Sequence, residues 1–203
     1  MKLNLKDIQK YLFPLKRLFT KYRPIKTVDQ VKNFIQEQSA QVSQMTLYGY
    51  LKTRMGAKHV IMFEDKDFLN SINIAKWHIY SASLIDCTFF CFSFLYKEKK
   101  IEKTDDANKV FFEILFSEKA NGMILDAYEG ATKEFNLRYP NMDWLNYYKS
   151  KPFEHCCNEL YNWSPIADEL KKLDKKIVIN SMYLKWNNVQ NEFKRLTNKF
   201  NNT

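Results

Sequence analysis

Residues 79–96 read IYSASLIDCTFFCFSFLY, an apolar run with a single charged side chain, Asp86. A membrane-spanning helix needs about 20 predominantly apolar residues, and a central aspartate costs about 2.5–3.5 kcal/mol on insertion scales. Four hydroxyl side chains make the run more polar still: Ser81, Ser83, Thr88 and Ser93. The run therefore predicts the central core helix of a soluble domain and not a membrane span.

The polar residues in and around this run share one face of the predicted helix. At about 100° per residue they fall within less than half of the helical circle. They are Asn73, Lys76, Ser83, Asp86, Ser93 and Lys97. A narrow polar stripe on a largely apolar helix predicts a core helix that touches solvent along one edge.

Helical signals continue on the N-terminal side of the run. Thr27 to Gln30 form a T-x-x-Q capping box, and apolar residues follow at helical spacing. This pattern predicts a helix that runs to Met55 and ends at Gly56, because glycine is favoured just after a helix C-terminus. Residues 59–63 form a short apolar stretch that is compatible with extended backbone, although no sheet is expected.

The C-terminal half predicts further helices. Thr104 is a candidate N-cap for a helix that ends at residues 121–122, and a second helix over residues 123–139 is stopped by Pro140. Residues 150–152 open another helix, and residues 164–165 (Ser-Pro) open one more. The apolar stripe of the last helix repeats every three or four residues, through Met182, Trp186, Val189, Phe193, Leu196 and Phe200. Residues 177–179 are also compatible with extended backbone.

Glycine is scarce, with four in 203 residues, so the chain has few places where the backbone turns tightly. Together with the periodicity, this predicts an all-α fold: a single helical domain of about six to eight helices over residues 27–203, preceded by a basic amphipathic arm at residues 1–26. A domain of this length buries a substantial core.

The arm carries eight lysines and arginines and one acid, Asp7, whereas residues 27–170 have a small net negative charge. Its apolar residues repeat at helical spacing, although Pro14 divides the repeat. An apolar face with basic flanks is typical of helices that lie on anionic membranes. The expected anion or membrane contacts are Lys2, Lys6, Lys10, Lys16, Arg17, Lys21 and Arg23. Docking of the arm on its own domain, and an organellar transit peptide, remain open alternatives.

Nucleic acid is another polyanion that suits the basic ends of the chain. The last helix carries basic residues beside several asparagines, but its aromatic residues fall on the apolar stripe and are expected in the core. The sequence has no zinc-finger, RNP-type or clear helix-turn-helix signature. Nucleic-acid binding is therefore a second alternative.

Common catalytic motifs are absent from the sequence. The spacing of the glycines excludes a G-x-S-x-G nucleophile elbow, a Walker loop and a dinucleotide fingerprint, and none of the three histidines stands in H-E-x-x-H. An enzyme would need a site in a pocket between helices, for which the candidate residues are Glu64, Asp65, His78 and Asp86. An acidic helix start equally explains the first two, and a satisfied core histidine explains His78.

The cysteines could form a soft-metal site with His155, but adjacent Cys156 and Cys157 have poor spacing for tetrahedral coordination. Phenylalanines surround Cys87 and Cys91. No secretory signal is recognisable, so a reducing compartment and buried free thiols are expected. No metal and no cofactor are predicted.

Four stretches resemble a family of uncharacterised alphaproteobacterial proteins of about this length. They are residues 46–56 (TLYGYLKTRMG), 62–65 (MFED), 71–78 (SINIAKWH) and 163–174 (WSPIADELKKLD). Some members of that family carry an automatic esterase label. The resemblance implies a bacterial or bacterium-derived protein, and it brings no catalytic residues that can be placed on this sequence.

These patterns predict a non-catalytic helical protein for interaction or assembly, cytoplasmic, whose candidate partners are another protein or an anionic membrane surface that the arm contacts. An enzyme of the hydrolase or esterase class, with a non-standard site in a helical pocket, is the first alternative. A convergent pocket that contains any of its four candidate residues would favour that alternative.

Overall fold

The computed structural model describes residues 24–56 and 64–200, and this part of the chain contains six α-helices and no strand. The α-helices are α3 (Val28–Met55), α5 (Lys66–Lys97), α6 (Asp105–Ala120), α7 (Leu125–Arg138), α8 (Glu154–Trp163) and α9 (Asp168–Leu196). Three short 3-10 helices accompany them: η2 (Tyr139–Asn141) and η3 (Tyr147–Lys149) lie between α7 and α8, and η4 (Thr197–Lys199) follows α9. The predicted all-α, single-domain fold is thus confirmed.

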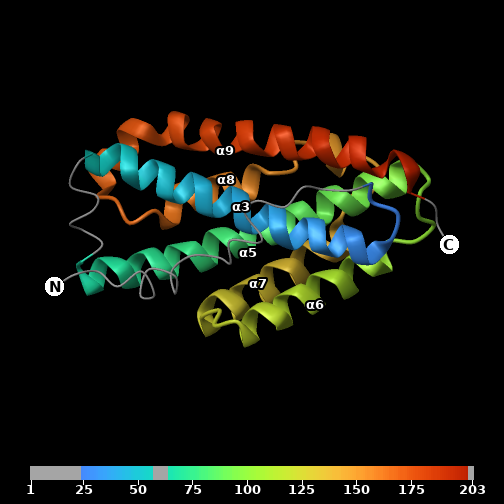
Figure 1. The fold of residues 1–203 in the computed structure, drawn as a ribbon, viewed down its shortest axis with the longest axis horizontal. Coiled ribbons are helices and arrows are strands. Elements are labelled where there is room, and N and C mark those ends of the chain that lie inside the picture. Colours follow the sequence, from blue (N-terminus) through green and yellow to red (C-terminus); the bar gives the residue numbers. More distant parts are fainter. Residues whose placement is uncertain (1–23, 57–63, 201–203) are drawn as a thin grey trace.

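Helix α5 is the centre of the bundle. It packs against α3, α6, α7, α8 and η3, while α9 lies on α3 and α8 along one long side (Figure 1). By length and composition α5 is the one described helix that could cross a membrane, but 94% of its most apolar window is buried inside the bundle. The prediction of a core helix for residues 79–96 agrees with this burial.

The prediction that one edge of α5 touches solvent is wrong for the middle of the helix. Lys76, Ser83, Asp86 and Ser93 are all buried, because neighbouring helices and η3 cover that edge as well. The hydroxyls find partners there: Ser43 Oγ donates to Ser83 Oγ at 2.9 Å, and Ser93 Oγ donates to a backbone carbonyl at 2.8 Å. Burial penalises the ammonium of Lys76 and lowers its pKa to about 8.

The ends of α3 follow the sequence signals. The Thr27 side chain accepts a hydrogen bond from the Gln30 N–H, which caps the first turn. Gly56 ends the helix with a φ of 53°, a conformation that glycine adopts without the Cβ clash of other residues. The helix over residues 27–55 is therefore confirmed.

The start of the last helix was predicted incorrectly. Ser164 does not begin α9 but closes α8, where its Oγ donates to the Leu160 carbonyl at 2.5 Å. Helix α9 begins at Asp168 after Ala167 and continues without a break to Leu196. Residues 177–179 are helical within it, and residues 59–63 lie outside the described part of the chain.

Aromatic rings fill the core between the helices. Phe111 of α6 stacks on Phe135 of α7 at 3.9 Å between ring centroids, and Phe153 stacks on Trp186 of α9 at 4.1 Å. Ile25, in the predicted arm, is also buried and donates its N–H to the Leu196 carbonyl at 3.0 Å. These contacts attach α9, and Ile25 in the segment before α3, to the same core.

Candidate functional site

The four predicted pocket residues are distributed over three different places. Glu64 is exposed in the turn before α5, and Asp65 is the N-cap of that helix, where Oδ1 accepts from the N–H groups of Asp67 and Phe68 at 2.9 and 3.2 Å. Neither residue lines either of the two pockets described below. The alternative interpretation of both as an acidic helix start matches this geometry.

Asp86 is completely buried and lies in a polar cluster between α5, α7, η3 and α8. Its Oδ1 accepts from Arg138 Nη2 at 2.8 Å and from the Tyr147 hydroxyl at 3.1 Å, and its Oδ2 accepts from the Cys156 N–H at 2.8 Å. The single proton of the Tyr147 hydroxyl is shared between Asp86 Oδ1 and the Pro152 carbonyl, which lies 2.6 Å from the hydroxyl oxygen. Both carboxylate oxygens are thus hydrogen-bonded to groups of the fold itself.

Two titratable side chains beside the Asp86 carboxylate are held in their neutral forms. Burial, followed by the charge of Asp86, raises the pKa of Tyr147 well above its usual value. Burial and the neighbouring Cys157 thiol raise the pKa of Cys156 in the same way. The Asp86 carboxylate, hydrogen-bonded at both oxygens and surrounded by groups held neutral, connects α5 with α7 and α8.

His78 is the one predicted candidate that borders a cavity. A pocket of about 270 Å³ lies between α5, α7 and α8. Each helix contributes residues about one turn apart, so each presents a single face to the pocket. The lining residues are His78, Ser81, Ala82 and Ile85 from α5, Asp126, Ala127, Gly130, Ala131 and Glu134 from α7, and His155, Glu159 and Trp163 from α8.

The imidazole of His78 is held between a ring and a carboxylate. It stacks on Trp163 with 3.6 Å between ring centroids and 2° between the planes. Its Nε2 lies 3.1 Å from Asp126 Oδ2, a close polar contact. Burial lowers the pKa of His78 below its usual 6.5, against the opposing effect of Asp126 and Glu159, so the ring is neutral at pH 7.

The pocket is acidic although the whole chain has a net charge of +9. Three carboxylates line it, Asp126, Glu134 and Glu159, and no lysine or arginine of the described chain does. Glu159 Oε2 accepts from Trp163 Nε1 at 2.8 Å, a neutral donor. Glu134 lies 4.0 Å from Arg138 Nε, which is a distant ion pair. Most of the negative charge in the pocket is therefore uncompensated.

Ser81 is the hydroxyl that lines the pocket, and it is poorly placed as a nucleophile. Its Oγ donates to the Trp77 carbonyl at 2.7 Å, a common way for a helical serine to satisfy its hydrogen bond. Within the described residues, no three histidine, cysteine or acidic side chains are close enough together to hold a metal ion. All four cysteines are buried and free, as expected.

The predicted anion contacts cannot be placed. The seven basic residues of the arm, from Lys2 to Arg23, lie outside the described residues, so the arm stays a prediction. In the last helix, Trp186 and Phe193 are buried in the core, as is Phe200 just beyond it. The expectation that these rings pack internally is confirmed, and they form no stacking surface for nucleic acid.

Sequence reasoning missed most of the pocket. Asp126 and Glu134 are eight residues apart on α7, with Ala127, Gly130 and Ala131 between them on the same face. His155, Glu159 and Trp163 form a similar row on α8. Rows of residues at this spacing indicate a single helix face, but by themselves they do not distinguish a face that lines a cavity from one that faces solvent.

Comparison with known proteins adds no functional assignment. No protein-family model matches this chain, and neither the curated proteins nor the solved structures include a significant match.

Proposed function

We propose that this protein binds a small organic cation, such as an amine, in the pocket between α5, α7 and α8. The observation that carries this proposal is the lining itself, with three carboxylates and no basic side chain of the described chain in a protein that is otherwise strongly basic. Carboxylates accept charge-assisted hydrogen bonds from ammonium groups, and such bonds are about twice as strong as neutral ones.

The remaining lining residues suit a small amphipathic molecule. Ile85, Ala127 and Ala131 give the pocket an apolar base, while the stacked rings of His78 and Trp163 form one wall. Apolar walls with a few convergent polar groups are typical of ligand pockets. A neutral His78 adds a hydrogen-bonding partner without placing a positive charge beside the ligand.

Calorimetric titration of the full-length protein tests the proposal with putrescine and choline as cationic probes and acetate and inorganic phosphate as anionic probes. We expect binding of at least one cation and of neither anion. Glu134→Gln combined with Glu159→Gln should weaken cation binding by about 10²- to 10⁴-fold, because each of the two lost charged acceptors is worth about 1.5–3 kcal/mol. The matched control is Glu129→Gln, an exposed α7 residue outside the lining, which should bind as the wild type does.

Preferred binding of the anions would contradict the proposal, and so would unchanged cation affinity in the double variant. A steric variant gives an independent check. A Cβ at Gly130 would meet no atom within 4 Å, so Gly130→Leu fills pocket space without a backbone clash and should abolish binding with every carboxylate intact.

Hydrolysis is a second candidate function, because a neutral histidine beside a carboxylate is a general-base arrangement. His78 would take a proton from water, and the resulting hydroxide would attack an ester carbonyl to release an acid and an alcohol. This route needs no protein nucleophile and agrees with the esterase label of the family that the sequence resembles. In hydrolysis of p-nitrophenyl acetate, His78→Gln should lower kcat/KM by about 10²- to 10⁴-fold. Equal rates in variant and wild type would contradict it.

A further inference from the structure

Four large apolar side chains on α9 face solvent. Leu170, Leu173, Ile177 and Leu184 are 44%, 76%, 71% and 66% exposed. Their spacing of three, four and seven residues places them within a sector of about 60° on the helix. We call these four residues the α9 outer stripe.

The outer stripe lies on the side of α9 that faces away from the bundle. The buried residues of α9, among them Val178, Met182 and Trp186, occupy the opposite side. Figure 1 shows α9 along one outer edge of the bundle, packed against α3 and α8 on its inner side. The stripe is therefore a line of exposed apolar side chains, of which Ile177 also borders a hollow beside α3.

Exposed lysines flank the stripe. Lys176 lies on one side of it and Lys185 on the other, while Lys172 is exposed further around the helix. The acids of α9 nearby compensate little of this charge, because Asp174 is bound to Arg54 and Tyr50 of α3 and Asp168 is paired with Lys171. Among the described residues of the first turns of α9, this leaves Glu169 as the acid with no ion pair. The surface around the stripe is thus both apolar and positive.

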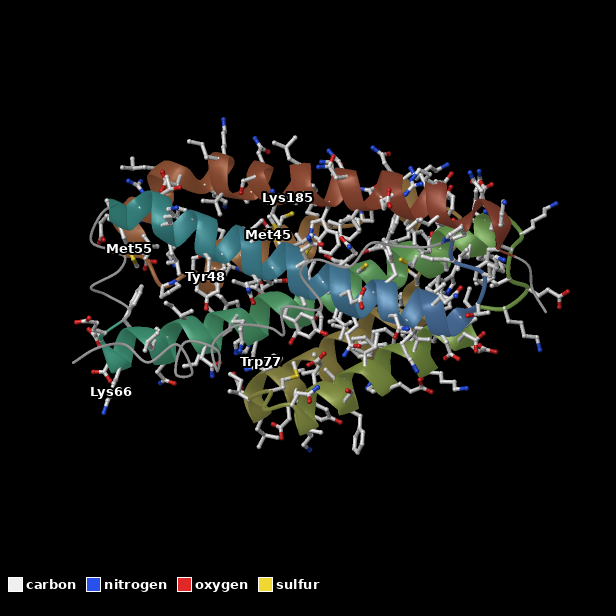
Figure 2. The ribbon with its side chains drawn as sticks, in the orientation of Figure 1. Met45, Tyr48, Met55, Lys66, Trp77 and Lys185 are labelled. Carbon is white, nitrogen blue, oxygen red and sulfur yellow. The ribbon has the colours of Figure 1, made fainter. Side chains whose placement is uncertain are left out.

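An apolar hollow of about 340 Å³ extends this surface toward α3. Met45, Gly49 and Tyr50 line it from α3, and Ile177 and Lys185 line it from α9. Figure 2 shows Met45 and Lys185 close together where the two helices meet. Met45 is 48% exposed, so the hollow continues the apolar stripe and has an ammonium group at its rim.

We propose that the α9 outer stripe rests on an anionic lipid surface, with its leucines and Ile177 among the acyl chains and its lysines at the headgroups. An apolar line with basic flanks is the pattern of interfacial helices. A second copy of this chain is a poorer occupant, because it would bring two positive surfaces together. Four apolar residues are also far fewer than the roughly 20–30 residues on each side of a stable protein interface.

This proposal is independent of the pocket and of the N-terminal arm. Flotation of the full-length protein with vesicles tests it, comparing phosphatidylcholine alone with phosphatidylcholine that contains about 30% phosphatidylserine. We expect binding to the anionic vesicles only. Lys172→Gln, Lys176→Gln and Lys185→Gln together should weaken it by about 100-fold, since each lysine near an anionic surface is worth about five-fold.

Leu173→Ser with Ile177→Ser should weaken binding by more than about 10-fold, because these side chains then lose their burial in the acyl region. The matched control is Leu125→Ser with Leu137→Ser, two α7 leucines that are similarly exposed and should be neutral. Absence of wild-type binding overturns the proposal, as does wild-type affinity in the stripe variants, which would assign the contact to another region such as residues 1–26. A dimer seen by light scattering and lost in the Leu173/Ile177 variant would assign the stripe to a second copy instead.

Discussion

Asp86 and His78 lie on the same helix, eight residues or about 12 Å apart, yet they differ in how completely the fold uses them. Every oxygen of the Asp86 carboxylate accepts hydrogen bonds from α7, η3 or α8. His78, by contrast, lines a cavity, and its buried Nε2 lies against Asp126 Oδ2. A buried polar group with all its partners supplied by the fold is part of the scaffold, whereas a residue that lines a cavity can also contact a ligand.

The largest expected effect on stability is at Asp86. Asp86→Ala should lower the free energy of unfolding by about 3–5 kcal/mol, because it leaves the half-buried Arg138 without its carboxylate partner. Urea denaturation measures the change. Glu129→Ala, at an exposed position on α7, is the control and should stay within about 0.5 kcal/mol of the wild type. An Asp86→Ala loss as small as that of the control would remove the contrast between the two sites.

Arg138 should couple strongly to Asp86. Arg138→Met alone should cost about 1–3 kcal/mol, because it leaves a buried carboxylate short of a charged donor. The double variant with Asp86→Ala should cost less than the sum of the single variants, with a coupling energy of about 0.5–3 kcal/mol. Additive losses in the same urea denaturation experiment would mean that the ion pair does not hold α5 and α7 together.

His78 should contribute little to stability but should make it depend on pH. His78→Phe keeps the stack on Trp163 and should change the free energy of unfolding by less than about 1.5 kcal/mol at pH 7. Because the folded pKa lies below 6.5, the unfolded chain binds a proton more readily. The contribution of His78 to stability is present above pH 6.5 and is lost as pH falls through the folded value.

The readout is the difference in stability between wild type and His78→Phe from pH 7 to pH 5, measured by urea denaturation. The wild type should lose more stability than the variant over this range. Parallel curves for the two proteins would show that His78 is as fully satisfied as Asp86.

The smallest expected effect is at the pocket wall. Gly130→Ala should raise the free energy of unfolding by about 0.5–1 kcal/mol, because alanine has the higher helix propensity and its Cβ meets only open space. Gly122→Ala is the contrasting control, since its φ of 93° disfavours any side chain, and it should destabilise the protein. The Tm of Gly130→Ala should therefore rise and that of Gly122→Ala should fall. A lower Tm for Gly130→Ala would mean that there is no room for a Cβ at this position.

The sequence predicted the fold more completely than the site. Helix α3 was predicted from end to end, because Thr27 and Gly56 are local signals that act on their own turn of backbone. The exposed edge of α5 was predicted wrongly, because periodicity shows that Lys76 and Asp86 share a face but does not show what covers that face. For the pocket, only His78 was identified.

The reason lies in chain distance. The carboxylates that surround His78 come from α7 and α8, some 50 to 80 residues away in the sequence, and only the packing of both helices on α5 brings them to the imidazole. The acids of α7 looked like ordinary solvated residues, because their pattern alone does not distinguish a cavity wall from an exposed helix face. Only the tertiary structure, which shows what packs against α7, decides whether that face lines a cavity or is exposed.

Helix α9 also has unequal ends. None of its first ten residues is buried, and its first core residue is Val178, whereas Trp186 and Phe193 further along are fully buried. The first turns are attached to the bundle through polar contacts: the Asp174 carboxylate binds Tyr50 and Arg54, and Arg54 Nη2 donates to the Leu170 carbonyl at 3.1 Å. A few polar contacts cost less free energy to break than a packed core, so this end should open locally while the rest of the helix stays folded. Amide hydrogen exchange along α9 would then be fast near Asp168 and slow toward Leu196. Leu170 and Leu173 would lie in the part of the helix that can change its orientation relative to the bundle without unfolding the domain.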